Sequence, residues 1–211
     1  NNLDVCLALE NKVVYDIVDV ISGRCRVSQA LIEDLESGLY VLPSASDNPI
    51  VTAQTFRNVI DSLVGFDYVL IDCPAGIENG FHRAVSSARE AIVVTTPAVS
   101  AIRDADKVIT LLNGYQLESV SVVVNRVRGE MVSRGEMMSP SDITRLLRSE
   151  PIGIVPDDDL ITLYSQVGKV PEYASSDKAF KYLAENVHYG TRKFYEYNKW
   201  SFWSRFKRRA R

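Results

Sequence analysis

The sequence predicts an α/β fold, with a mostly parallel sheet covered by helices on both faces and an amphipathic helix at the C-terminus. The first observation is a set of short apolar runs that are continuous rather than alternating, which is typical of strands buried on both faces. The runs occupy residues 39–42, 68–71, 92–94, 120–124 and 152–155. The second and third observations are the spacing of these runs and the helical periodicity between them.

Turn-forming or polar residues follow each of the last four runs, so each run is a plausible strand that ends at a defined point. These residues are Asp72, Thr95, Asn125 and Pro156. The intervals between them have roughly the length of a βαβ unit, about 30 residues. The sequence therefore predicts parallel strands joined by helices.

The intervals themselves carry helical patterns. Residues 101–112 place apolar side chains near one helix face. Ser139 followed by Pro140 is a typical helix start, which predicts a helix over residues 141–147. Residues 175–187 form a further candidate helix, whereas residues 126–139 are polar and carry the weakest signal.

The strand ends predict a ligand site. Open parallel sheets bind ligands at the carboxyl ends of their strands. Asp72, Thr95, Asn125 and Asp157 should meet at that edge. Asp and Asn at strand ends are also common as plain turn residues, but four of them on parallel strands favour a ligand site.

The charge distribution separates a body from a tail. The chain has 211 residues and a net charge of −3, yet from Lys199 onward it carries six basic residues and no acidic one. We therefore predict a domain over residues 1–190 and a tail over residues 191–211 that seeks an anionic surface. The three cysteines lack C-x-x-C spacing, which argues against a zinc site or a disulfide framework.

The tail has the pattern of an interfacial membrane anchor. On a helical wheel its aromatic side chains gather on one side and its basic side chains lie largely elsewhere. The expected membrane residues are Tyr195, Trp200, Phe202, Trp203, Arg205, Phe206, Lys207, Arg208 and Arg209. A helix packed on its own body remains the alternative. A nucleic-acid tail is disfavoured because the aromatic residues cluster.

The sharpest motif spans residues 72–78, with the sequence Asp-Cys-Pro-Ala-Gly-Ile-Glu. An aspartate that ends a buried strand can hold the water shell of Mg²⁺ or orient a hydrolytic water. Pro74 and Gly76 set a tight turn whose backbone N–H groups can meet a terminal phosphate. The alternative is a strand-to-helix turn without a ligand.

This motif and several others resemble the MinD family of division-site ATPases, within the deviant Walker A group of P-loop NTPases. The similar segments are residues 2–4, 13–16, 30–32, 66–78, 91–97, 99–106 and 132–139. The resemblance covers nearly the whole chain. It implies an ATPase that uses ATP and Mg²⁺.

The resemblance also implies roles for individual residues. Asp72 would be catalytic and hold Mg²⁺ through water, and Gly76 would act with it in the switch turn. The nucleotide-binding residues would be Asn2, Asp72, Pro74, Gly76, Asn125, Arg126, Pro156 and Asp157. Among these, Asn125 and Arg126 would contact adenine, while Pro156 and Asp157 would form the other side of the base pocket.

One departure from the family is large. The sequence contains no G-x-x-x-x-G-K-[ST], and Gly168-Lys169 is followed by Val170. The phosphate-binding loop and the N-terminal strands of the family are therefore absent from these residues. We expect a fragment of a normal ATPase that is inactive alone. The alternatives are a pseudoenzyme acting as a membrane-tethered adaptor, and a related partition or flagellar-placement ATPase.

The implied biology is control of division septum placement. The resemblance implies ATP-driven homodimerisation and a cytoplasmic protein that associates peripherally with the inner face of the plasma membrane. Its expected partners are a division inhibitor, a topological specificity factor and the anionic membrane surface, with no nucleic acid.

Overall fold

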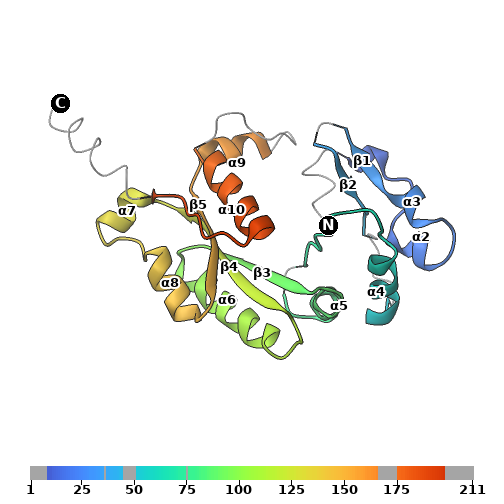
Figure 1. Cartoon of the computed structure of the whole chain (residues 1–211), viewed down its shortest axis with the longest axis horizontal. Coiled ribbons are helices and arrows are strands. Elements are labelled where there is room, and N and C mark those ends of the chain that lie inside the picture. Colours follow the sequence, from blue (N-terminus) through green and yellow to red (C-terminus); the bar gives the residue numbers. More distant parts are fainter. Residues whose placement is uncertain (1–8, 36, 45–50, 75, 166–174, 198–211) are drawn as a thin grey trace. The chain divides into compact units, whose positions relative to one another are not determined.

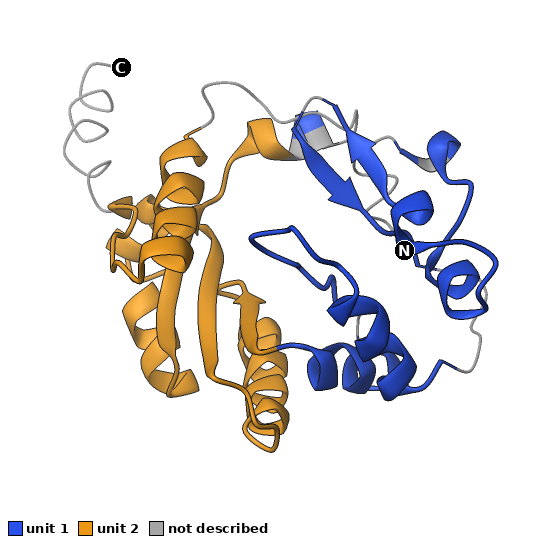
Figure 2. Ribbon diagram, turned by 45° about the vertical axis from the view of Figure 1, so that its right-hand side comes forward, with its two compact units in different colours: residues 1–88, 163–170 blue, residues 89–162, 171–211 orange. Residues whose placement is uncertain are grey.

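The computed structural model describes residues 9–35, 37–44, 51–74, 76–165 and 175–197. The chain forms two compact units, which Figure 2 shows in different colours. Unit 1 comprises residues 1–88 and 163–170, and unit 2 comprises residues 89–162 and 171–211.

Unit 1 is mainly helical. Its elements are η1 (Glu10–Lys12), α2 (Ile17–Ile21), α3 (Val27–Ala30), β1 (Ile32–Asp34), β2 (Leu39–Val41), α4 (Ala53–Asp61) and α5 (Asn79–Ser87). The Asp16 side chain caps α2 by accepting hydrogen bonds from the backbone N–H groups of Val18 and Asp19. Helices α4 and α5 pack together, and Arg83 Nη1 donates to the Val51 carbonyl at 3.0 Å.

Two expectations about strands in unit 1 were wrong. The run at 39–42 forms β2, but β2 pairs antiparallel with β1 instead of joining the parallel sheet. The run at 68–71 forms no strand, and Leu70 is 84% exposed. A strand requires a neighbour that accepts and donates its backbone hydrogen bonds. Apolar character alone therefore did not decide the structure of this run.

Unit 2 contains the parallel sheet, as Figure 1 shows. Its elements are β3 (Glu90–Thr95), α6 (Val99–Leu112), β4 (Ser119–Val127), α7 (Gly129–Ser133), α8 (Pro140–Leu147), β5 (Glu150–Pro156), the start of α9 (Asp159–Ser165) and α10 (Asp177–Tyr189). The strands lie in the order β3-β4-β5, and both pairs are parallel. The predicted α/β fold class is confirmed.

Helices α6 and α8 cover one face of this sheet. Val122 and Val124 of β4 are both 0% exposed on that face, and the paired Val93 shares it. The apolar side chains predicted for residues 101–112 face the core from α6. Ser139 caps α8 through a 3.2 Å hydrogen bond from the Asp142 N–H, as its position before Pro140 predicted.

Helix α10 covers the other face over β4 and β5. Val123, Val155 and Ala179 form its buried cluster, with Leu183 packed alongside. The helix approaches closely because β5 carries glycine at this point: a Cβ at Gly153 would lie 3.0 Å from the Leu183 side chain.

Strand β3 is less well covered on the α10 side. Its Ile92 and Val94 side chains point to that face and remain 44% and 61% exposed. Among the described residues β3 pairs with β4 alone, so its other edge carries no strand. No helix within the described part of the chain is long and apolar enough to cross a bilayer.

Candidate functional site

The end of β4 contains a bulge that displaces two of the predicted site residues from the ladder. Val124 pairs with Ile154, but Val127 pairs with Pro156, so β4 has one extra residue here. Arg126 adopts the left-handed conformation, with φ at 58°. The Asn125 Oδ1 accepts the Arg126 N–H at 2.8 Å and holds this turn. Left-handed conformations are costly for side chains other than glycine and cluster at functional sites.

The end of β5 fixes the displaced arginine. The Asp157 N–H donates to the Val127 carbonyl at 3.1 Å, and its Oδ1 accepts from Arg126 Nε at 3.0 Å. The Asp157 side chain is 27% exposed, and the arginine side chain is 65% exposed. The ion pair therefore sets the direction of the guanidinium while leaving its flat surface accessible.

The structure thus brings together four residues that the sequence predicted, namely Asn125, Arg126, Pro156 and Asp157. An amide can pair with the polar edge of a base, and a guanidinium plane can stack on its face. The arrangement suits a planar heterocycle with a polar edge. It lies at the carboxyl edge of the parallel sheet, where such folds bind ligands.

Asp158 supports this edge and was not identified from the sequence. Its carboxylate accepts from the Ser175 hydroxyl at 2.7 Å, the Ser176 N–H at 2.9 Å, the Ser176 hydroxyl at 3.1 Å and the Leu160 N–H at 3.0 Å. It therefore ties the start of α10 to the end of β5. The only sequence signal was an aspartate just before a helix start, which is a common capping pattern.

These hydrogen bonds determine the pKa of Asp158. Burial acts to raise the pKa of the carboxyl, but the hydrogen bonds from Ser175, Ser176 and Leu160 together outweigh it and hold the pKa below its ordinary value. A lowered folded-state pKa contributes stability that is present above the unfolded-state pKa. That stability is lost as pH falls through the lower folded-state pKa.

Replacing Asp158 with asparagine is expected to lower the free energy of unfolding at neutral pH by about 1–3 kcal/mol, since Ser176 is fully buried and loses a charged acceptor. The deficit should shrink as pH falls below about 4. Urea unfolding at several pH values measures both effects. The exposed Asp106→Asn substitution is the control and should have little effect at any pH. An equal loss at pH 7 and pH 3 would contradict this account.

The switch-like residues Asp72, Pro74 and Gly76 belong to unit 1. The run before Asp72 forms no strand, so Asp72 does not end a strand of the parallel sheet as predicted. Gly76 has φ at 91°, which favours glycine, and it lies just before α5. The Pro74 ring packs closely on Gly80, in the first turn of α5. A Cβ at position 80 would lie only 2.7 Å from the Cγ of Pro74, so there is no room for a larger residue there.

The thiol of Cys73, next to Asp72, is not suited to act as a nucleophile. Burial of the sulfur, and then the charge of Asp72, raise the pKa of Cys73, so the thiol stays protonated at neutral pH. No group of three metal-ligating side chains gathers within the described residues. A single carboxylate is compatible with Mg²⁺, which usually keeps several of its waters.

The other predicted residues have different placements. Thr95 is buried at the end of β3 and donates weakly to the Thr96 carbonyl at 3.4 Å. Tyr195 packs against the cluster under α10. The remaining predictions, Asn2 and the tail residues from Trp200 onward, lie outside the described residues.

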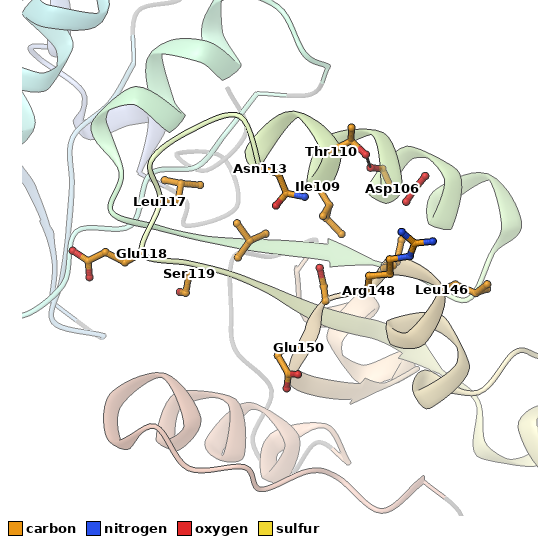
Figure 3. Close-up of a pocket in the computed structure, with 13 residues that line it drawn as sticks. Asp106, Ile109, Thr110, Asn113, Leu117, Glu118, Ser119, Leu146, Arg148 and Glu150 are labelled. Carbon is orange, nitrogen blue, oxygen red and sulfur yellow. Dashed lines mark hydrogen bonds between the residues drawn. The ribbon is translucent and has the colours of Figure 1, made fainter.

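A groove of about 740 Å³ lies at the opposite end of the sheet (Figure 3). It is lined by the last turns of α6 and α8 and by the first residues of β4 and β5, including Asn113, Ser119, Arg148 and Glu150. Because ligands of such sheets bind at the carboxyl edge, this groove is separate from the candidate site.

Comparison with known proteins supports one family. No family model matches the chain. The septum site-determining protein MinD of Bacillus subtilis (strain 168) is 45% identical over 174 residues, which is 80% of this chain and 65% of that protein. The chain therefore spans slightly less than two thirds of that relative's length.

Solved structures agree. In the MinC:MinD cell division protein complex of Aquifex aeolicus, the matching chain has a TM-score of 0.85 and 37% identity, over 93% of this chain and 82% of that one. MinD from Pyrococcus horikoshii OT3, complexed with Mg-ADP, has a TM-score of 0.74 and 27% identity, over 89% and 78%. The parallel sheet, the extent of these matches and their identity together show that this chain belongs to the MinD family of septum site-determining ATPases.

Proposed function

We propose that this chain is part of an ATPase that binds ATP with Mg²⁺ and takes part in placing the division septum. The observation that carries the proposal is the β4 bulge, in which Asn125 and Arg126 are held against Asp157 at the carboxyl edge of the sheet. The Mg-ADP complex of the Pyrococcus relative supports a magnesium-bound adenine nucleotide as the ligand.

The roles of the residues follow from their chemistry. Asn125 would hydrogen-bond the edge of adenine, and Arg126 would stack on its face while Asp157 holds the guanidinium. Pro156 would close the other side of the base pocket. Asp72 would hold Mg²⁺ through water, and the turn formed by Pro74 and Gly76 would approach the terminal phosphate.

The membrane and partner proposals rest on the tail and on the relatives. Residues 191–211 would form a basic, aromatic tail that binds an anionic bilayer at the inner face of the plasma membrane. ATP would hold two copies together, and paired tails would bind more strongly than one. The Aquifex complex of MinC with MinD supports a protein partner. That partner would be a division inhibitor, and a topological specificity factor would be a second partner.

Nucleotide binding to residues 1–211 tests the base site directly. We expect Mg-ADP to shift the NMR amide signals of residues 125–129 and of Asp157 and Asp158. Asp157→Ala should weaken binding by about tenfold or more, because Arg126 loses the group that positions it. Glu118→Ala is the control, since it removes an exposed ion pair with Arg89 elsewhere in unit 2.

The same samples test the chemistry. We expect no measurable ATP turnover by residues 1–211, because they contain no phosphate-binding loop motif, and lost donors to a reacting group typically cost about 10²-fold or more. Mg-ADP shifts confined to other residues would refute the base site. Magnesium-dependent turnover abolished by Asp72→Ala would refute the expected inactivity.

A further inference from the structure

The segment from Thr191 to Tyr197 lies against unit 2 and connects α10 to the basic tail. It forms no helix up to Glu196, although the sequence placed Tyr195 on the apolar side of the tail helix. Its contacts with the body are specific, and they are made by residues that neither the base site nor the switch turn uses. We call residues 191–197 the strap.

Asn186 of α10 holds the first part of the strap. It is 3% exposed, and all its hydrogen-bonding capacity is used. Its Nδ2 donates to the carbonyls of Ile152 at 2.9 Å and Lys193 at 2.7 Å. Its Oδ1 accepts from the Thr191 hydroxyl at 2.8 Å and the Lys193 N–H at 2.9 Å. Three of the four hydrogen bonds therefore go to the strap.

Exposed ion pairs reinforce the same stretch. Lys193 Nζ lies 2.6 Å from Glu185 on α10, a hydrogen bond that raises the pKa of the lysine. Arg192 donates to the Pro151 carbonyl at 3.0 Å and lies 3.4 Å from Glu150. Exposed pairs contribute little to stability individually, so Asn186 is the main polar attachment.

The second part of the strap is held by packing. The Tyr195 ring lies against the cluster of Val123, Val155 and Ala179. The Tyr197 carbonyl lies against Gly129, in the space that the side chain of any larger residue at position 129 would need. The strap therefore ends beside the first residue of α7, close in sequence to Asn125 and Arg126.

Tyr195 has a second favourable environment. Beyond the strap the chain carries Trp200, Phe202, Trp203 and Phe206 among basic residues, and aromatic side chains are favoured at a membrane interface. While the strap is seated, Tyr195 is held by the body and cannot contribute to that aromatic surface.

We propose that the strap is a releasable contact that competes with the membrane for Tyr195, so that binding of the tail to an anionic bilayer draws residues 191–197 off the body. This inference rests on the proposed membrane association. The body and the bilayer are alternative partners for one aromatic residue, and each must weaken the other by the same factor.

Hydrogen exchange of the 211-residue chain, followed by mass spectrometry, tests the proposal. The probe is a vesicle of phosphatidylglycerol and phosphatidylcholine. Without vesicles, the peptide covering residues 190–197 should retain a slowly exchanging amide, because the Lys193 N–H is bound to Asn186. With vesicles we expect the exchange rate of this amide to rise by about tenfold or more, because the amide becomes accessible to water when the strap leaves the body.

Variants test the mechanism from the protein side. Asn186→Leu removes the three hydrogen bonds to the strap, so exchange should be fast without vesicles and vesicle affinity should rise by about tenfold. Thr191→Val removes one of these bonds and should give a smaller change in the same direction, which preserves the test if Asn186→Leu does not fold. Asn113→Leu, at an exposed helix end, is the matched control and should change neither quantity.

The outcomes separate this inference from the proposed function. Vesicle binding that leaves residues 190–197 protected, or an Asn186→Leu protein that binds no more tightly, would overturn the competition while leaving membrane association intact. Absence of vesicle binding by both the wild type and the variants would overturn membrane association and the competition together.

Discussion

Replacing Ile143 with alanine is expected to lower the free energy of unfolding by about 2–5 kcal/mol, the usual range for a large aliphatic residue in a well-packed core. Ile143 is 0% exposed and lies on α8, which packs on α6 and on strands β4 and β5. Truncation removes its buried methyl groups and leaves a cavity under the sheet. A loss at the upper end of the range would indicate that the surrounding helices do not close the space.

The same helix supplies the control. Leu146 is 59% exposed, so Leu146→Ala should change stability by no more than about 0.5 kcal/mol. Both variants replace a large aliphatic residue of α8 by alanine. Because alanine is a good helix former, neither substitution should weaken the helix itself. Urea denaturation followed by circular dichroism gives the two values. Similar losses in both variants would contradict the assignment of the loss to the burial of Ile143.

Unit 2 could be predicted from the sequence because its signals are local. Helix α6 carries its apolar side chains at helical spacing, and α8 begins at a serine followed by proline. The continuous runs at 92–94, 120–124 and 152–155 became β3, β4 and β5. The positions of Asn125 and Asp157 followed from the same logic, because parallel strands place their carboxyl ends at one edge. Arg126 and Pro156 were named as site residues only through the family resemblance.

The features that the sequence did not predict depend on distant partners. Asp158 and Asn186 are ordinary polar residues in the sequence, and their importance lies in hydrogen bonds to distant parts of the chain. Asp158 binds serines that lie 17 and 18 positions later, and Asn186 binds a carbonyl that lies 34 positions earlier. The run at 68–71 has the composition of a strand, but pairing decides whether a strand forms. Tyr195 fits the pattern of an amphipathic helix, yet the buried cluster under α10 competes for it.

Replacing both Ile92 and Val94 by threonine is expected to lower the self-association constant of the chain by about tenfold or more, because the substitutions remove exposed apolar area. Both side chains lie on β3 and are substantially exposed. Among the described residues, the strand also has one edge without a partner strand. An apolar surface beside an open edge is a typical site of edge-to-edge association. Threonine retains the preference for a strand while removing much of the apolar surface.

Sedimentation velocity over a range of protein concentrations measures this association, with thermal unfolding as a check that the double variant remains folded. The control combines Val99→Thr and Leu146→Gln, which remove apolar surface of comparable exposure on helices of unit 2. If β3 is the associating element, the control should associate like the wild type. Equal association of all three proteins would place the contact elsewhere, whereas loss in both variants would indicate general hydrophobicity. A selective loss in the β3 variant would assign the association to this strand, because the control removes similar apolar groups without altering the open edge.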